Sequence, residues 1–154
     1  MTYRRRLIAT VATLAGAAGL APAKVRADEG KAPQHRAALQ VDDSRAEVMN
    51  LALNNVAAIA RYYADKGEEV VLELVAFGPG LTMLRADNSP VAARIASLAD
   101  GMPHLVFSAC QNTMRAVERA EGKPVPLVPQ ARTVPSGVVR LIELQEQGWS
   151  YIRT

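Results

Sequence analysis

The chain has 154 residues, 49% of them hydrophobic, and a formal net charge of +3. This length and apolar content suit one compact domain, and internal repeats and low-complexity tracts are absent. The positive charge does not indicate nucleic-acid binding, because five of the 18 basic residues and none of the 15 acidic ones precede Asp28, which leaves 13 basic against 15 acidic.

The N-terminal segment has the pattern of a secretory signal peptide. Three arginines, Arg4-Arg-Arg6, precede an apolar, small-residue stretch over residues 7–21, and cleavage sites follow at Ala23 and Ala27. The stretch is shorter than the roughly 20 apolar residues that a membrane span requires. We therefore expect residues 1–27 to direct export to the periplasm, and no membrane attachment after their removal. The arginines suit both the general secretory and the twin-arginine route.

Strands and helices alternate through the rest of the chain. We expect residues 28–35 to be a flexible segment and residues 36–154 to be the domain. Apolar runs between turn residues predict five strands, at residues 36–41, 69–77, 104–110, 132–134 and 149–152. Apolar residues at helical spacing predict four helices, at residues 44–66, 89–101, 113–121 and 135–148.

Three short patterns mark the ends of these elements. Ser44 and Glu47 predict a capping box at the start of the first helix. Ser89 and Pro90 predict the N-cap and first turn of the second helix. Prolines within residues 122–129 predict a surface loop, because proline suits neither a helix interior nor a central strand.

Repeated strand–helix units predict an α/β fold: a doubly wound, mostly parallel, five-stranded sheet with helices on both faces. Ligands and chemistry gather at the carboxyl ends of the strands in such sheets. We expect four segments to meet at that edge: Asp42-Asp43, Gly78-Pro-Gly80, Cys110-Gln-Asn112 and Pro135-Ser-Gly137.

Cys110 is the only cysteine, and it lies where the third predicted strand turns into a helix. A helix N-terminus favours a thiolate, so Cys110 is a candidate nucleophile; a buried structural thiol is the alternative. A lone cysteine in an exported protein cannot form an internal disulfide. Asn112, Thr113 and backbone N–H groups are available as donors to a thiolate, whereas Asp42 or Asp43 would oppose ionisation if close.

Several reaction classes are excluded. Gly78-Pro-Gly-Leu-Thr-Met83 lacks the third glycine of a dinucleotide fingerprint, and there is no lysine-bearing phosphate loop, so we expect no nicotinamide or ATP cofactor. One cysteine and two histidines show no metal-ligand spacing, and no Gly-x-Ser-x-Gly elbow is present. His104 lies about 20 Å from Cys110 along the same strand, and His35 shares that far end, which excludes a cysteine–histidine dyad.

A thiolate without a base or a metal can still accept a sulfane sulfur as a persulfide and pass it to another thiol, because thiol exchange depends on thiolate fraction, nucleophilicity and access. Five motifs, in order over about residues 36–153, resemble DsrE/DsrF-like proteins. They are Leu51-Ala-Leu-Asn-Asn55, Val75-Ala-Phe-Gly-Pro-Gly80, Ala109-Cys-Gln-Asn-Thr-Met114, Val134-Pro-Ser-Gly-Val-Val139 and Leu144-Gln-x-Gln-Gly-Trp-x-Tyr-Ile152.

This resemblance implies a small flavodoxin-like domain that forms a homo-oligomer, expected to be a trimer or hexamer. It also implies a role in sulfur relay and sulfur oxidation, through a cysteine that here is Cys110. The export signal and the Cys-x-Asn-Thr motif correspond to an exported branch of the family. Its characterised relatives are cytoplasmic and work in hetero-oligomers.

We therefore expect an exported sulfur carrier, at most a sulfurtransferase-type protein, whose partners are its own copies and a thiol or sulfur-donor protein. Cys110 is the expected persulfide acceptor. The expected binding residues around it are Gln111, Asn112, Thr113, Gly78, Gly80 and Ser136. Two alternatives remain open: a non-catalytic, homo-oligomeric binding or assembly module with a structural cysteine, and a redox sensor that forms an intermolecular disulfide.

Overall fold

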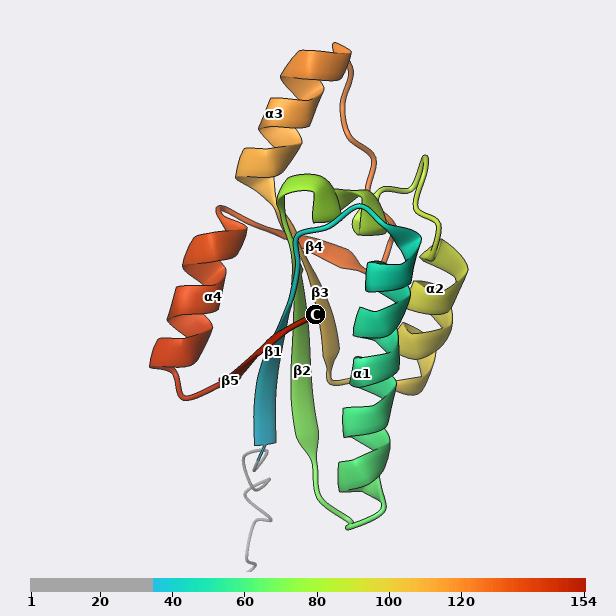
Figure 1. The fold of residues 1–154 in the computed structure, drawn as a ribbon, viewed down its shortest axis with the longest axis vertical. Helices are drawn as coiled ribbons and strands as arrows, with labels where there is room; N and C mark the ends of the chain where they lie inside the picture. Colours follow the sequence, from blue (N-terminus) through green and yellow to red (C-terminus); the bar gives the residue numbers. More distant parts are fainter. Residues whose placement is uncertain (1–34) are drawn as a thin grey trace, which may run out of the picture. The chain divides into compact units, whose positions relative to one another are not determined.

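The computed structural model describes residues 35–154, so the predicted signal peptide and residues 28–34 lie outside the described residues. Strands and helices alternate along the chain (Figure 1). The strands are β1 (His35–Val41), β2 (Val70–Ala76), β3 (Leu105–Cys110), β4 (Ala131–Val134) and β5 (Ser150–Arg153). The helices are α1 (Ala46–Ala64), α2 (Ala92–Gly101), α3 (Gln111–Glu121) and α4 (Gly137–Glu146), and a 3₁₀ helix, η1 (Gly78–Leu84), follows β2.

The five strands form one sheet in the order β4-β3-β2-β1-β5, and every pair is parallel. The chain adds β1 to β4 in one direction and then crosses back to place β5 beyond β1. Helices α1 and α2 cover one face of the sheet and α4 covers the other (Figure 1). The predicted doubly wound, flavodoxin-like α/β fold is therefore confirmed, and all five strands end at the same edge.

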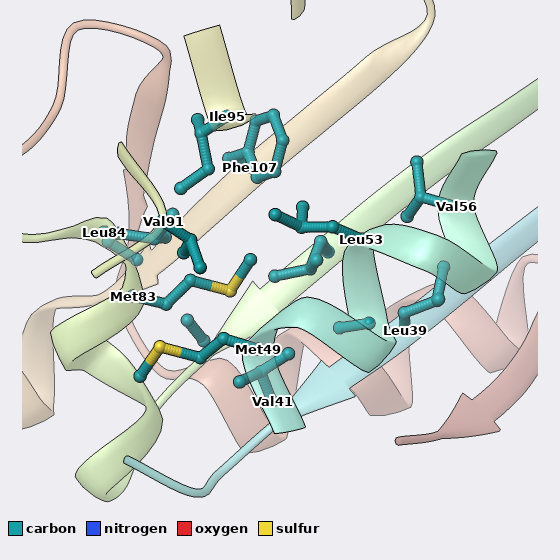
Figure 2. Packing of buried hydrophobic residues seen from close by; sticks show 14 of the residues in the cluster. Leu39, Val41, Met49, Leu53, Val56, Met83, Leu84, Val91, Ile95 and Phe107 are labelled. Atoms are coloured by element: carbon teal, nitrogen blue, oxygen red, sulfur yellow. The ribbon is translucent and has the colours of Figure 1, made fainter. Parts of the chain in front are cut away.

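The face beneath α1 and α2 carries the main hydrophobic core. Alternate strand residues such as Leu39, Leu74 and Phe107 point into it and are almost fully buried. Met49 and Leu53 of α1 lie one helical turn apart and pack onto them (Figure 2). The apolar runs that predicted the strands are thus explained by burial of this face.

The opposite face has a much smaller apolar cluster. Ala38 of β1 and Val75 of β2 pack there against Leu141 and Leu144 of α4. Three apolar side chains of α4 remain about half exposed: Val138, Val139 and Ile142. α4 is therefore held to the sheet by few apolar contacts.

The two predicted N-terminal caps, at Ser44 and Ser89, are wrong. α1 begins at Ala46 with Arg45 at the N-cap position, and no side chain caps it, so Ser44 and Glu47 form no capping box. Asp43 instead accepts the Arg45 N–H at 2.8 Å and pairs with its guanidinium, which organises the turn before the helix. α2 begins only at Ala92, after the predicted Ser89 cap.

Ser89 has a different task in the turn before α2. Its hydroxyl donates to the Met83 carbonyl at 2.5 Å and accepts the Val91 N–H at 3.3 Å. It therefore fixes the connection from η1 rather than the first turn of the helix. Within residues 35–154, no helix combines the length and apolar character needed to span a membrane.

Candidate functional site

Cys110 is the last residue of β3 and the N-cap residue of α3. β3 lies between β2 and β4, so the thiol is placed at the carboxyl edge of the sheet. α3 begins at Gln111, two residues earlier than the sequence predicted, because Cys110 itself takes the capping position. Only 4% of the cysteine is exposed.

Donors from the starts of two helices surround the thiol. The hydroxyl of Thr113 and the backbone N–H groups of Asn112 and Thr113 belong to the first turn of α3, and the N–H of Gly137 belongs to the first residue of α4. Burial raises the pKa of the Cys110 thiol, but these donors favour the thiolate, outweigh burial and leave the pKa below its ordinary value. The N-terminal dipoles of both helices favour the same negative charge.

Thr113 is oriented by the loop after β2. The backbone N–H of Gly78 donates to the Thr113 hydroxyl oxygen at 3.0 Å, which leaves the hydroxyl proton for the sulfur. Gly78 has φ +53°, a left-handed conformation that glycine adopts without strain. Gly78 therefore contributes to the thiol site through Thr113.

The start of α4 lies close to the thiol because Gly137 has no side chain. A Cβ at this position would come within 2.9 Å of Phe77, so any other residue would push the helix away from the sheet. Ser136 is the N-cap residue of α4, and its hydroxyl accepts the Val139 N–H at 3.5 Å. The Asn112 N–H also donates to the Pro135 carbonyl at 3.3 Å, which joins the two helix starts.

The other predicted site residues are engaged elsewhere. The Gln111 side chain donates to the Thr133 hydroxyl at 3.2 Å, and the Asn112 side chain accepts a hydrogen bond from Arg115. Gly80 lies within η1, where a Cβ would collide with the Val41 carbonyl, so its role is close packing. Of the predicted turn, Asn112 and Thr113 are the residues whose donors lower the pKa of the Cys110 thiol.

The two acidic residues after β1 have partners of their own, and the two histidines lie at the strand ends that the sequence predicted. Asp42 accepts a hydrogen bond from Gln40, and Asp43 is paired with Arg45. His35 is the first residue of β1, and His104 precedes β3, so both histidines lie at the amino ends of their strands. Within residues 35–154, the acidic, histidine and cysteine side chains form no group of three that could hold a metal ion.

Glu73 was not among the predicted site residues, yet it is the most buried charged group of the described chain, with 1% exposure. Burial raises its pKa, but hydrogen bonds from Arg140 and Ser108 and the charges of Arg132 and Arg140 lower the pKa below its ordinary value. The carboxylate therefore stays ionised beneath α4. A single acidic residue inside an otherwise apolar strand was the available signal, because such a charge requires partners from other elements.

α3 is held differently from the other helices. None of its side chains is fully buried, and it extends beyond the sheet edge (Figure 1). At its far end, Glu121 pairs with the buried Arg85 through two hydrogen bonds of 2.6 and 2.9 Å. α3 is thus held at both ends, by the chain at Cys110 and by the ion pair at Glu121, and this fixes the position of its first turn beside the sulfur.

A groove of about 360 Å³ runs between β4 and α4. Its lining includes Val134, the register partner of Cys110, as well as Pro135 and Ser136. A larger cavity of about 580 Å³ lies at the amino ends of β1 and β5, beside His35 and Tyr63. Of these two, the groove between β4 and α4 is the one lined by Val134, the residue paired with Cys110.

The chain matches no protein-family model, and no curated protein matches it at a significant level. Among solved structures, it is similar to a protein of unknown function from Methanobacterium thermoautotrophicum. The two share 29% sequence identity with a TM-score of 0.66, and the match covers 78% of this chain and 99% of the archaeal one. This likeness supports the fold and assigns no activity.

Proposed function

We propose that the protein is a sulfur carrier whose Cys110 accepts a sulfane sulfur and passes it to a partner thiol. The thiolate attacks the outer sulfur of a donor persulfide, R–S–SH. The donor S–S bond breaks, the donor leaves as the thiolate R–S⁻, and Cys110 holds the group –S–SH. Reversal of this step on an acceptor thiolate delivers the sulfur without any external oxidant or reductant.

The observation that carries this proposal is the position of Cys110 at the N-terminus of α3, in a turn that the Asn112 N–H joins to the start of α4 through the Pro135 carbonyl. Thr113 supplies a hydroxyl and an N–H, and Asn112 and Gly137 supply one N–H each. Such donors stabilise a negative charge on the Cys110 sulfur and lower the pKa of the thiol without a base or a metal. This is the feature that sulfur transfer requires and that an inert buried cysteine has no need of.

The burial of Cys110 sets a condition on the transfer. With 4% of the residue exposed, a donor reaches the sulfur only when the surrounding segment opens. The Pro135-Ser136 segment lines the groove between β4 and α4, and the Pro135 carbonyl accepts the N–H of Asn112 in the thiol turn. We assign loading of Cys110 to movement of this segment.

The same burial supports a second candidate function, a binding or assembly module with a structural thiol. The half-exposed Val138, Val139 and Ile142 of α4 offer an apolar contact surface for such a module. In both functions we propose a homo-oligomer, a trimer or hexamer as the resemblance to DsrE/DsrF-like proteins implies. Light scattering on the purified protein measures that assembly directly.

The deciding experiment is the intact mass of the reduced full chain after anaerobic exposure to polysulfide, beside a Cys110→Ser control. The sulfur-carrier proposal predicts a gain of one or more sulfur atoms on the wild type alone, reversed by a thiol reductant. No adduct, with Cys110 alkylated only in denaturant, would establish the structural thiol. A disulfide-linked dimer formed by oxidant alone, without a sulfur adduct, would establish the redox sensor.

Export is part of the proposed function, because it places the carrier in the periplasm. The pattern over residues 1–27 supports it. The corresponding test is fractionation of cells that express the full chain or a chain without residues 1–27. The proposal predicts a shortened protein in the periplasm for the first and cytoplasmic retention for the second.

A further inference from the structure

The position of α4 relative to the thiol needs an explanation beyond apolar packing. The segment before α4 is tied to the thiol turn, because the Pro135 carbonyl accepts the Asn112 N–H at 3.3 Å, yet only Leu141 and Leu144 of the helix are buried in the small cluster beneath it. Arg140 follows Gly137 by one helical turn and reaches under the helix to the sheet. Its partner there is the buried Glu73.

The Glu73 carboxylate joins four elements through both of its oxygens. One oxygen accepts from Ser108 of β3 at 2.7 Å and from Arg140 Nε at 2.8 Å. The other oxygen accepts from Arg140 Nη2 and from Arg132 of β4, both at 2.8 Å. Glu73 itself belongs to β2, so one side chain ties β2, β3, β4 and α4 together.

This network lies directly beside the thiol along the sheet. Ser108 and Arg132 are register partners on β3 and β4, and the next pair on the same face is Cys110 with Val134. Two residues along a strand correspond to roughly 6.6 Å. The carboxylate therefore fixes the strand ends and the helix turn that surround the sulfur.

We infer that Glu73 is a positioning residue, which acts through Arg140 and Arg132 to hold the first turn of α4 against the Cys110 sulfur. The inference rests on the proposed role of Cys110 as a reactive thiol. Glu73 does not touch the sulfur, and its effect on the thiol is carried by the backbone of α4. The charged groups that face it are Arg132 on β4 and Arg140 on α4, and Glu143 contacts Arg140 from the solvent side at 3.5 Å.

The test is the pH profile of Cys110 alkylation by iodoacetamide in the full chain. Glu73→Gln removes the charge that binds both arginines, so α4 loosens and the thiol pKa rises. A looser α4 also changes access to the sulfur, so the rate at each pH is divided by the rate at the high-pH plateau. We expect this normalised rate at pH 7 to fall at least about threefold, since the thiolate fraction below the pKa falls tenfold for each unit that the pKa rises. Glu143→Gln is the matched control, because it removes a half-exposed carboxylate from the same arginine, and we expect an unchanged profile.

A second variant keeps the test valid if Glu73→Gln does not fold. Arg140→Lys retains the charge and the long side chain of a residue that is 22% exposed, but it loses the two-pronged contact with Glu73. We expect it to fold and to raise the thiol pKa in the same direction. A wild-type alkylation midpoint in Arg140→Lys, or in folded Glu73→Gln, would overturn the inference, since a merely structural role lowers thermal stability without moving the thiol pKa.

The outcome is separable from that of the sulfur-carrier proposal. Alkylation reads the ionisation of Cys110 and needs no persulfide. A wild type that forms no sulfur adduct while Glu73→Gln shifts its thiol pKa would remove the carrier function and keep Glu73 as a positioning residue. If the wild type forms a sulfur adduct while the thiol pKa of both variants equals that of the wild type, the carrier function stands and Glu73 is not a positioning residue.

Discussion

The two faces of the sheet are held by different forces. The face under α1 and α2 is a broad apolar core that includes Leu39, Leu53 and Phe107, all at most 1% exposed. The face under α4 combines two buried leucines with a carboxylate bound by Arg132 and Arg140. Apolar packing stabilises without fixing direction, whereas a bidentate ion pair sets the position of a helix turn. The first face therefore supplies stability, and the second places α4 at the thiol.

The largest expected effect comes from the apolar face. Leu53→Ala removes a fully buried side chain of α1 and should lower the free energy of unfolding by about 3 kcal/mol, through lost burial and a residual cavity. Denaturant unfolding measures the loss. The alkylation midpoint of Cys110 should stay at its wild-type value, and a shifted midpoint would show that the two faces are not separate.

Gly137→Ala should disturb both properties. Its Cβ would lie 2.9 Å from Phe77, so the first turn of α4 must move, at a cost of about 1–3 kcal/mol of stability. The displaced N–H no longer reaches the sulfur, and the thiol pKa should rise. The matched control is Gly101→Ala at the end of α2, where a Cβ meets nothing within 4 Å; it should leave the thiol pKa unchanged.

Thr113→Val tests the hydroxyl alone. The valine keeps the shape of the side chain but removes the donor to Cys110 and the acceptor for the Gly78 N–H. We expect the thiol pKa to rise by about 1 unit, the equivalent of one hydrogen bond of about 1.4 kcal/mol. Thr113→Ser retains the hydroxyl and should stay close to the wild type. Equal midpoints for the valine and serine variants would contradict the account.

Acid should loosen the α4 face by a smaller amount, and Trp149 can report it. Trp149 is the only tryptophan and packs against the cluster beneath α4. The Glu73 pKa is lowered in the folded protein, so its contribution to stability is complete above its unfolded pKa of about 4.3 and is lost as the pH falls through the lower folded value. Trp149 emission should be constant from about pH 7 to 5 and change only below about pH 4. A change between pH 7 and 5 would assign the loosening to another group.

Much of the fold could be predicted because each strand has its own local signal. The strands from Val70 to Ala76 and from Leu105 to Cys110 were both predicted from apolar runs between turn residues. Helix starts were less predictable, because capping groups compete at short range. Asp43 organises the turn before α1 in place of Ser44, and Cys110 takes the capping position of α3 ahead of the predicted start at Thr113.

The sequence predicted that the segments of Gly78 and Gly137 meet Cys110 at one sheet edge, whereas the individual contacts were predictable only close to Cys110 in sequence. Thr113 and the Asn112 N–H belong to the turn that follows the cysteine, so their proximity is local. Gly137 reaches the sulfur from 27 residues downstream, because α4 crosses to the opposite face of the sheet before β5. Glu73 depends on three other elements at once, and no local pattern specifies which cations complete it.

The most direct measurement is the pH dependence of alkylation at Cys110 in the folded wild-type chain, with the same chain in denaturant as its reference. Because Cys110 is the only cysteine, the signal belongs to one group. The account predicts a midpoint in the folded protein below that of the unfolded chain, which should lie near about 8.5. A folded midpoint at or above the unfolded value would show that burial outweighs the converging donors and would contradict a stabilised thiolate at this site.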